Sequence, residues 1–187
     1  MTMKSFKTPL FGVHLVEPAV FPDERGFFLE TYHRQKYRDQ GIKVPFVQDN
    51  HSHSRQHVLR GLHYQLHHAQ DKLVYALSGA IFDVAVDIRR GSPTFGRWFG
   101  AELSAENHRQ LFVPQGFAHG FCVLSETADV LYKCSDFYSP EHEYGLLWSD
   151  PGLAIQWPVE DPVLSAKDAG YPSLGEIPEA QLPVYNG

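Results

Sequence analysis

The sequence predicts an all-β fold, an antiparallel sandwich or barrel of the jelly-roll kind with a few short helices. The 187 residues include 13 Phe, 9 Tyr and 3 Trp, which favour strands, and 15 Gly and 13 Pro, which favour tight turns. Short apolar runs recur between turn residues, whereas helical periodicity is scarce. Many short strands joined by tight turns are typical of this architecture.

Strands are expected through the middle of the chain. Single strands are placed at residues 58–65, 94–103, 110–114, 118–124 and 128–138. Residues 72–88 contain two apolar runs that are separated by Ser78 and Gly79, which predicts a hairpin. Alternation in the second run places Phe82, Val84, Val86 and Ile88 on one face and Asp83, Ala85 and Asp87 on the other. Turns are marked by Gly91-Ser92-Pro93, Pro114-Gln115-Gly116 and Ser139-Pro140.

Helix signals are confined to two short stretches. Residues 34–40, which precede Gly41, predict one helix, and a short helical turn is expected near 104–109. The last ~30 residues are rich in proline and are expected to wrap the domain in extended form. We therefore interpret residues 1–187 as one domain whose last ~20 residues form an extended tail.

Composition limits the classes of function. The 16 basic and 22 acidic residues give a net charge of −6, which argues against a nucleic-acid-binding surface. Cys122 and Cys134 lie in apolar runs and are interpreted as reduced core thiols. The first residues lack an apolar leader and no run is long enough to span a membrane, so a soluble cytoplasmic protein is expected.

The segment LRGLHYQ, residues 59–65, places a histidine between cations. Arg60 and Lys72 cannot lose their charge cheaply, and a buried cation needs an anionic partner. A bound anion or an anionic intermediate is the simplest such partner. His63 has an unperturbed pKa near neutrality, so it is a candidate proton-transfer group. The alternative is a core histidine flanked by cations, the commoner situation for a single histidine in an apolar run.

Six histidines suggest a metal site, but the pattern argues against one; they are His51, His53, His57, His63, His67 and His68. Metal-binding barrels of the cupin type need H-x-H, a carboxylate and a later P-x-G-x-x-H. The chain has the later element, which ends at His119, but Gln65 and Gln70 replace the second histidine and the carboxylate. Glutamine is a poor ligand for divalent transition metals, so no metal is expected, apart from adventitious binding at His51-x-His53.

These residues and their neighbours resemble the dTDP-4-dehydrorhamnose 3,5-epimerases, metal-free cupin-like enzymes of deoxysugar nucleotide biosynthesis. The resemblance extends from about Phe21 to Asp168. Its matching stretches are DERGFFLE (23–30), VQDN (47–50), VLRGLHYQ (58–65), QDKLV (70–74), SGAIFDVAVDIR (78–89), SPTFG (92–96), PQGFAHGF (114–121), LYKCSDFYSPEHEYG (131–145), WSDP (148–151), IQWP (155–158) and LSAKD (164–168).

The resemblance implies a reaction and a catalytic set. The substrate would be dTDP-4-keto-6-deoxy-D-glucose, which is inverted at C3 and C5 on the way to dTDP-L-rhamnose. His63 matches the general base, Asp168 the carboxylate paired with it, Tyr132 the general acid and Lys72 the cation near the C4 oxygen. Considered by itself, Tyr132 is better explained as a core aromatic, because alternation places it on one face with Val130 and Cys134.

The resemblance also implies a binding set and a partner. Nucleotide- and sugar-contacting positions match Arg25, Glu30, Gln48, Asn50, Arg60, His119 and Glu143, and a thymine-stacking aromatic matches Tyr138. No cofactor is implied. The partners would be the dTDP-sugar and a second copy of the chain, in a homodimer whose N-terminal strands contribute to the partner's sheet.

Two questions remain open at this level. In a regular strand Arg60 and His63 would point to opposite faces, so a shared pocket requires a bulge or twist at Gly61. Three other functions compete with this one. They are an epimerase that acts at C3 or C5 alone, a non-catalytic sugar-nucleotide binding module, and a metal-dependent cupin oxygenase, which Gln65 and Gln70 disfavour.

Overall fold

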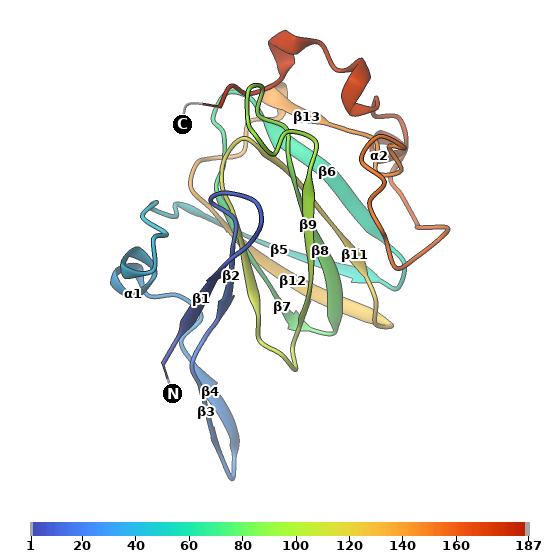
Figure 1. The fold of residues 1–187 in the computed structure, drawn as a ribbon. Coiled ribbons are helices and arrows are strands. Elements are labelled where there is room, and N and C mark those ends of the chain that lie inside the picture. Colours follow the sequence, from blue (N-terminus) through green and yellow to red (C-terminus); the bar gives the residue numbers. More distant parts are fainter. Residues whose placement is uncertain (1, 186–187) are drawn as a thin grey trace.

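The computed structural model describes residues 2–185, which form two antiparallel sheets packed face to face (Figure 1). The six-stranded sheet has the order β1 (Lys4–Lys7), β2 (His14–Glu17), β10 (Gln110–Val113), β7 (Lys72–Ser78), β12 (Thr127–Cys134), β5 (Gln48–Arg55). The five-stranded sheet has the order β13 (Glu143–Gly145), β6 (Leu59–Gln65), β11 (Phe117–Val123), β8 (Ala80–Asp87), β9 (Trp98–Ser104). The predicted all-β, antiparallel jelly-roll fold is confirmed.

The remaining elements lie outside these sheets. They are the hairpin of β3 (Val20–Asp23) and β4 (Gly26–Leu29), the helices α1 (Arg34–Asp39) and α2 (Ala166–Ala169), and the 3-10 helices η1 (Pro140–His142), η2 (Leu174–Glu176) and η3 (Glu179–Gln181). Helix α1 confirms the helix predicted at 34–40, whereas α2 was not expected. No helix within residues 2–185 is long and apolar enough to cross a bilayer.

Three apolar clusters hold the layers together. The first lies between the sheets and includes Val74 of β7 and Leu103 of β9. The second covers the outer face of the five-stranded sheet, where Val84 packs under the C-terminal residues. The third covers the six-stranded sheet beneath α1, around Tyr37. Full burial of one such side chain contributes about 1.5–3 kcal/mol.

The predicted alternation in β8 is confirmed, and both faces of this strand are buried. Ile81 and Ala85 point into the cluster between the sheets. Val84 and Val86 point outward, and the C-terminal segment covers them. Strand β8 is therefore covered on both faces, by the six-stranded sheet on one side and by the C-terminal segment on the other.

The hairpin predicted within 72–88 is wrong. Strands β7 and β8 do break at Gly79, but they belong to different sheets. One residue is too short for a hairpin loop, which needs at least two. Gly79 has φ +68°, and a Cβ there would lie 2.1 Å from the Thr127 carbonyl oxygen, so only glycine allows the chain to pass this corner.

Two predicted strands are shorter than expected. Strand β9 begins at Trp98 rather than residue 94, because the Asp87 side chain binds Ser92 and Thr94 and holds the preceding residues in a turn. Strand β12 ends at Cys134, after which Ser135 donates a hydrogen bond to the Asp71 carboxylate. The strands predicted at 58–65, 110–114 and 118–124 agree with the structure to within one residue at each end.

The C-terminal segment crosses the outer face of the five-stranded sheet (Figure 1). Ile177 and Leu182 are buried there, and Val184 bridges to Arg90. The segment contains the short helices α2, η2 and η3, so it is not extended throughout. Residues 186–187 of that predicted tail lie outside the described part of the chain.

Candidate active site

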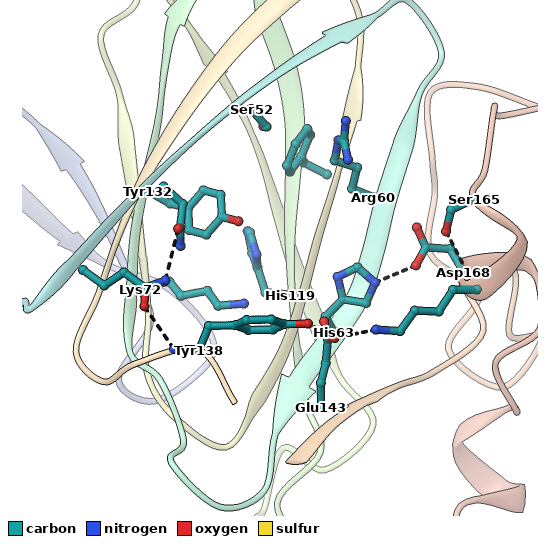
Figure 2. Close-up of a pocket in the computed structure, with 14 residues that line it drawn as sticks. Ser52, Arg60, His63, Lys72, His119, Tyr132, Tyr138, Glu143, Ser165 and Asp168 are labelled. Atoms are coloured by element: carbon teal, nitrogen blue, oxygen red, sulfur yellow. Dashed lines mark hydrogen bonds and ion pairs between the residues drawn. The ribbon is translucent and has the colours of Figure 1, made fainter. Parts of the chain in front are cut away.

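A cavity of about 420 Å³ opens between the inner faces of the two sheets, at the side where α2 lies (Figure 2). Its walls come from both sheets and from the C-terminal segment. The lining residues are Gln48, Asn50, Ser52, Arg60, His63, Lys72, His119, Phe121, Tyr132, Tyr138, Glu143, Ser165, Lys167 and Asp168. All but two of the predicted site residues are therefore brought together in one cavity.

Strand β6 forms one wall, and a bulge aims its side chains. Arg60 lies opposite Phe121 of β11, and His63 lies opposite His119. A step of three residues on β6 thus matches a step of two on β11, which is the register of a bulge with one extra residue. Gly61, with φ +129°, occupies this bulge. The predicted bulge is confirmed, and it brings Arg60 and His63 to the same face.

His63 is held by a carboxylate that reaches it from a distant part of the chain. Its Nε2 lies 2.6 Å from Asp168 Oδ1 (Figure 2). Asp168 is buried in α2, where the Ser165 hydroxyl caps the helix by accepting from the Asp168 N–H. Burial alone would raise the pKa of Asp168, but hydrogen bonds from His63, Ser165 and the Gly61 backbone hold that pKa below its ordinary value. The carboxylate is therefore ionised and orients the imidazole ring.

The six-stranded sheet forms the opposite wall. Tyr132 of β12 pairs with Asn50 of β5 on one side and with Val74 of β7 on the other, so its side chain shares their inward face. Tyr132 packs against the cluster between the sheets and also lines the cavity. Burial raises its pKa, so the phenol keeps its proton at neutral pH.

Two cations enter the cavity without an anionic partner among residues 2–185. Lys72 extends from β7, and burial lowers its pKa, although Cys134, Glu143 and Asp83 partly oppose this. Arg60 donates from Nε to the Ser54 hydroxyl at 3.0 Å, a neutral partner. The site therefore offers positive charge to an anionic ligand, as residues 59–72 predicted.

An ion pair closes one rim of the cavity. Glu143 of β13 accepts from Lys167 Nζ and, at 2.8 Å, from the Tyr138 hydroxyl. Burial opposes ionisation of Glu143, but these two partners lower its pKa. The Tyr138 backbone N–H donates to Gln48 Oε1 at 3.0 Å, which anchors this loop to β5. Lys167 was missed from the sequence, although it stands beside Asp168 in the motif LSAKD.

Two predicted binding residues lie outside the cavity. Arg25 is at the tip of the β3–β4 hairpin, with 84% of its side chain exposed, and it pairs with Asp23. Glu30 follows the same hairpin and pairs with Lys36 of α1. Figure 1 shows this hairpin projecting away from the barrel. Within one chain, neither residue contacts the ligand cavity.

The glutamines at the expected metal-ligand positions have structural partners. Gln65 donates to the His68 carbonyl and accepts from the Ser139 N–H. Gln70 donates to the Asp136 carbonyl. In the part of the chain that the structure describes, no three His, Cys, Asp or Glu side chains are arranged to hold a metal ion.

The geometry defines a class of site. A histidine–carboxylate pair lies on one wall and a protonated phenol on the other, and each wall adds a cation, Arg60 or Lys72, that has no anionic partner within residues 2–185. Such a cavity can move protons at a carbon atom of an anionic substrate while stabilising the charge that develops.

Comparison with known proteins gives the family. Residues 7–176 match the family model described as dTDP-4-dehydrorhamnose 3,5-epimerase. The chain is 58% identical to the dTDP-4-dehydrorhamnose 3,5-epimerase of Pseudomonas aeruginosa over 168 residues, which cover 89% of this chain and 93% of that protein. The chain belongs to the dTDP-4-dehydrorhamnose 3,5-epimerase family.

Solved structures are similar over almost the whole chain. The dTDP-6-deoxy-D-glucose-3,5-epimerase of Legionella pneumophila, in complex with dTDP-4-keto-L-rhamnose, superposes with a TM-score of 0.96 at 51% identity, covering 99% of this chain and 100% of that one. A 3'-monoepimerase of Streptomyces bikiniensis in complex with dTDP-quinovose superposes with a TM-score of 0.89 at 34% identity, covering 96% and 93%. The predicted resemblance is confirmed.

Proposed function

We propose that this protein inverts C3 and C5 of dTDP-4-keto-6-deoxy-D-glucose and so forms dTDP-4-dehydro-L-rhamnose. The observation that carries the proposal is the arrangement of His63 and Tyr132 on opposite walls of one cationic cavity. Inversion at carbon needs a base on one face of the sugar and an acid on the other. The 3,5-epimerases of Pseudomonas aeruginosa and Legionella pneumophila, to which this chain is similar, support the same assignment.

The chemistry fits the residue types. C3 and C5 are both adjacent to the C4 ketone, so loss of either proton gives an enolate. In our proposal His63 removes the proton, and Asp168 holds its ring and stabilises the imidazolium that forms. Tyr132 then delivers a proton to the other face of the same carbon. The phenol can do so because burial keeps it protonated.

Lys72 and Arg60 have separate roles in this proposal. Lys72 stabilises the enolate oxygen at C4, where negative charge appears only as the reaction proceeds, and such stabilisation raises the rate. Arg60 binds the diphosphate, for which its planar fork of donors is suited. Tyr138, whose ring is half exposed at the rim, stacks on the thymine.

We further propose that the protein is a homodimer in which the β3–β4 hairpin of one chain enters the cavity region of its partner. Phe27 and Phe28 on this hairpin are 59% and 69% exposed, which is unusual for large apolar side chains on neighbouring positions. Arg25 and Glu30 would then bind substrate in the partner's cavity. Buried free thiols at Cys122 and Cys134 support a reducing, cytoplasmic location.

Deuterium incorporation tests the proposed reaction. The protein is incubated with dTDP-4-keto-6-deoxy-D-glucose in deuterated water, and label at each sugar carbon is followed by NMR. We expect label at both C3 and C5, because both protons pass through groups that exchange with solvent. Label at one carbon would instead identify a mono-epimerase. Tight binding without label would identify a binding module.

His63→Ala identifies the base in the same assay. We expect exchange at both carbons to be abolished, with dTDP affinity retained, because the nucleotide binds elsewhere in the cavity. The matched control is His53→Ala: His53 is an exposed histidine on the outer face of β5, and its loss should leave exchange unchanged. Exchange at the wild-type rate in His63→Ala would remove His63 from this role.

A further inference from the structure

An aromatic ring lies beside His63, and the roles assigned above do not explain it. The ring belongs to Tyr171, which follows α2 in the chain. Its centroid lies 5.8 Å from that of the imidazole, and the two ring planes meet at 71°. Tyr171 does not line the cavity, so its ring contacts the candidate base rather than the space in which a ligand would bind.

The strand pairing explains where this ring lies. In the five-stranded sheet β6 stands between β13 and β11, and His63 is opposite Gly145 of β13 and His119 of β11. Directly opposed residues carry their side chains on the same face of a sheet. A Cβ on Gly145 would overlap the Tyr171 ring, so this ring occupies the place of a side chain at position 145. His63 is thus flanked by Tyr171 on one side and by His119 on the other.

The ring, and not the backbone, requires glycine at position 145. Gly145 is a strand residue whose φ lies outside the left-handed region, so other residues could adopt its conformation. The chain next to Tyr171 is also fixed to this edge of the sheet, because the Leu147 N–H donates to the Pro172 carbonyl at 2.8 Å. The ring is therefore held in the gap that Gly145 leaves beside His63.

The hydroxyl of Tyr171 does not account for this placement. It is buried and has no hydrogen-bond partner among residues 2–185. Burial raises the pKa of this phenol; the nearby Lys167 ammonium partly opposes the rise, but it is bonded to Glu143. A buried hydroxyl without a partner is unfavourable. What this position contributes is therefore the aromatic ring.

A second contact matters because the hydrogen bond to Asp168 does not fix the imidazole completely. The place of the ring depends on two side-chain torsions, and the second of them is intrinsically broad. The 2.6 Å contact between Nε2 and Asp168 Oδ1 constrains only one combination of the two. The Tyr171 ring blocks the remaining swing of the imidazole toward β13. Nδ1, the nitrogen that Asp168 leaves free, is then held in one place.

We propose that Tyr171 is a positioning residue, whose ring keeps Nδ1 of His63 aimed at the substrate carbon. The proposal rests on the proposed function for the role of His63 as base, whereas the contact between the rings can be tested without substrate. Displacing a reacting group by about 1 Å can lower a rate about 100-fold. Loss of the ring should therefore lower kcat and change KM little, because other residues of the cavity bind the nucleotide.

Tyr171→Ala and Tyr171→Phe test the ring. We expect kcat to fall at least about 10-fold in Tyr171→Ala, with KM within about twofold of wild type, and to return almost to the wild-type value in Tyr171→Phe. The matched control is Ile177→Ala, which truncates a buried side chain of the same C-terminal segment. It should lower the melting temperature and leave kcat unchanged. A wild-type kcat in Tyr171→Ala, or an equal loss in Ile177→Ala, would overturn the proposal.

Gly145→Ala displaces the ring without changing Tyr171 itself. The added methyl group fits the backbone but overlaps the ring, so we expect kcat to fall as it does in Tyr171→Ala. In the double variant the ring is absent and the methyl group has free space. The second change should then lower kcat no further. Multiplication of the two effects would show that the glycine and the ring act separately, and would contradict the proposal.

Carbon–proton NMR of the ligand-free, full-length protein with labelled histidine rings gives a readout that does not depend on turnover. The His63 signal is identified by its loss in His63→Ala. We expect it to be single and sharp in wild type and in Tyr171→Phe, and to shift and broaden in Tyr171→Ala and Gly145→Ala. Ile177→Ala should leave it unchanged.

The NMR result separates this inference from the proposed function. An unchanged His63 signal in both Tyr171→Ala and Gly145→Ala would show that the ring does not hold the imidazole, and the inference would fail. A signal that depends on the ring, in a protein without epimerase activity, would instead count against the proposed function.

Discussion

At the scale of single residues, Tyr132 belongs both to the core packing and to the cavity wall. Its ring packs against the core between the sheets, and the same side chain lines the cavity opposite His63. The two explanations considered for it from the sequence, core aromatic and general acid, are therefore compatible in one structure. Burial raises the pKa of its hydroxyl, which keeps the acid form available at neutral pH.

Replacing Tyr132 by Phe should separate proton removal from inversion. The Phe variant keeps the packing but cannot deliver a proton to the second face. We expect solvent label still to enter the substrate through His63, which returns a deuteron to the face it attacked, while the inverted product falls at least about 100-fold. NMR of the sugar measures both quantities.

Tyr144→Phe is the control for this change. Tyr144 stacks on Tyr64 and does not line the cavity, so its variant should behave as wild type. Inversion at an undiminished rate in Tyr132→Phe would exclude the hydroxyl as the acid.

At the scale of elements, the bulge in β6 brings the side chains of Arg60 and His63 into the same cavity. Gly61 adopts φ +129°, and a Cβ there would lie 2.5 Å from the Gly120 Cα of the neighbouring strand. Only glycine satisfies both the backbone conformation and the close approach. Without this bulge Arg60 would point away from His63, and the cavity would lose a cation.

Gly61→Ala should therefore damage both stability and activity. The clash is with backbone atoms, so β6 and β11 must separate, and we expect a loss of more than about 1 kcal/mol in the free energy of unfolding, with most of the activity lost. Urea unfolding and the epimerase assay measure the two effects.

Gly91→Ala is the matched control, because Gly91 also has a positive φ, +81°, but a Cβ there meets nothing within 4 Å. It should cost some stability and leave activity unchanged. Equal effects of the two variants would show that the close approach at Gly61 is unimportant.

Strand β5 illustrates why some elements were not predicted. Its sequence, QDNHSHSR, has no apolar face, so no strand was expected there. In the structure Gln48, Asn50 and Ser52 line the polar cavity, while His51 and His53 face solvent. A strand with a binding site on one side and water on the other carries no hydrophobic alternation.

At the scale of the whole molecule, distant segments assemble the site. His63 and Asp168 are separated by 105 positions, and the C-terminal segment returns across the five-stranded sheet to bring them together. The β3–β4 hairpin extends in the other direction, with Arg25 at its tip. If this hairpin completes the partner's cavity, as we propose, each site is built from two chains.

Complementation between two inactive variants tests this shared site. Arg25→Ala damages the partner's site and His63→Ala damages the chain's own site. In a mixed dimer both changes fall in one site and the other is intact. Co-expression should therefore restore about a quarter of wild-type activity, because half of randomly formed dimers are mixed.

The control is co-expression of His63→Ala with Asp168→Asn. Both residues lie in the cavity of their own chain, so every site in a mixed dimer carries a change and activity should not return. A failure of Arg25→Ala and His63→Ala to complement each other would exclude Arg25 from the partner's cavity.

The sequence by itself determined the all-β class, most central strands and a cationic site around His63, and it made a bulge at Gly61 the condition for Arg60 to share that site. Local alternation, turn residues and fixed charges are sufficient for these. Tertiary structure alone decided that β7 and β8 lie in different sheets, that Lys167 joins the cavity, and that Arg25 and Glu30 do not join it within one chain. It also decided the contact of Tyr171 with His63. The physical reason is that these features depend on contacts between segments far apart in the chain, which no local pattern records.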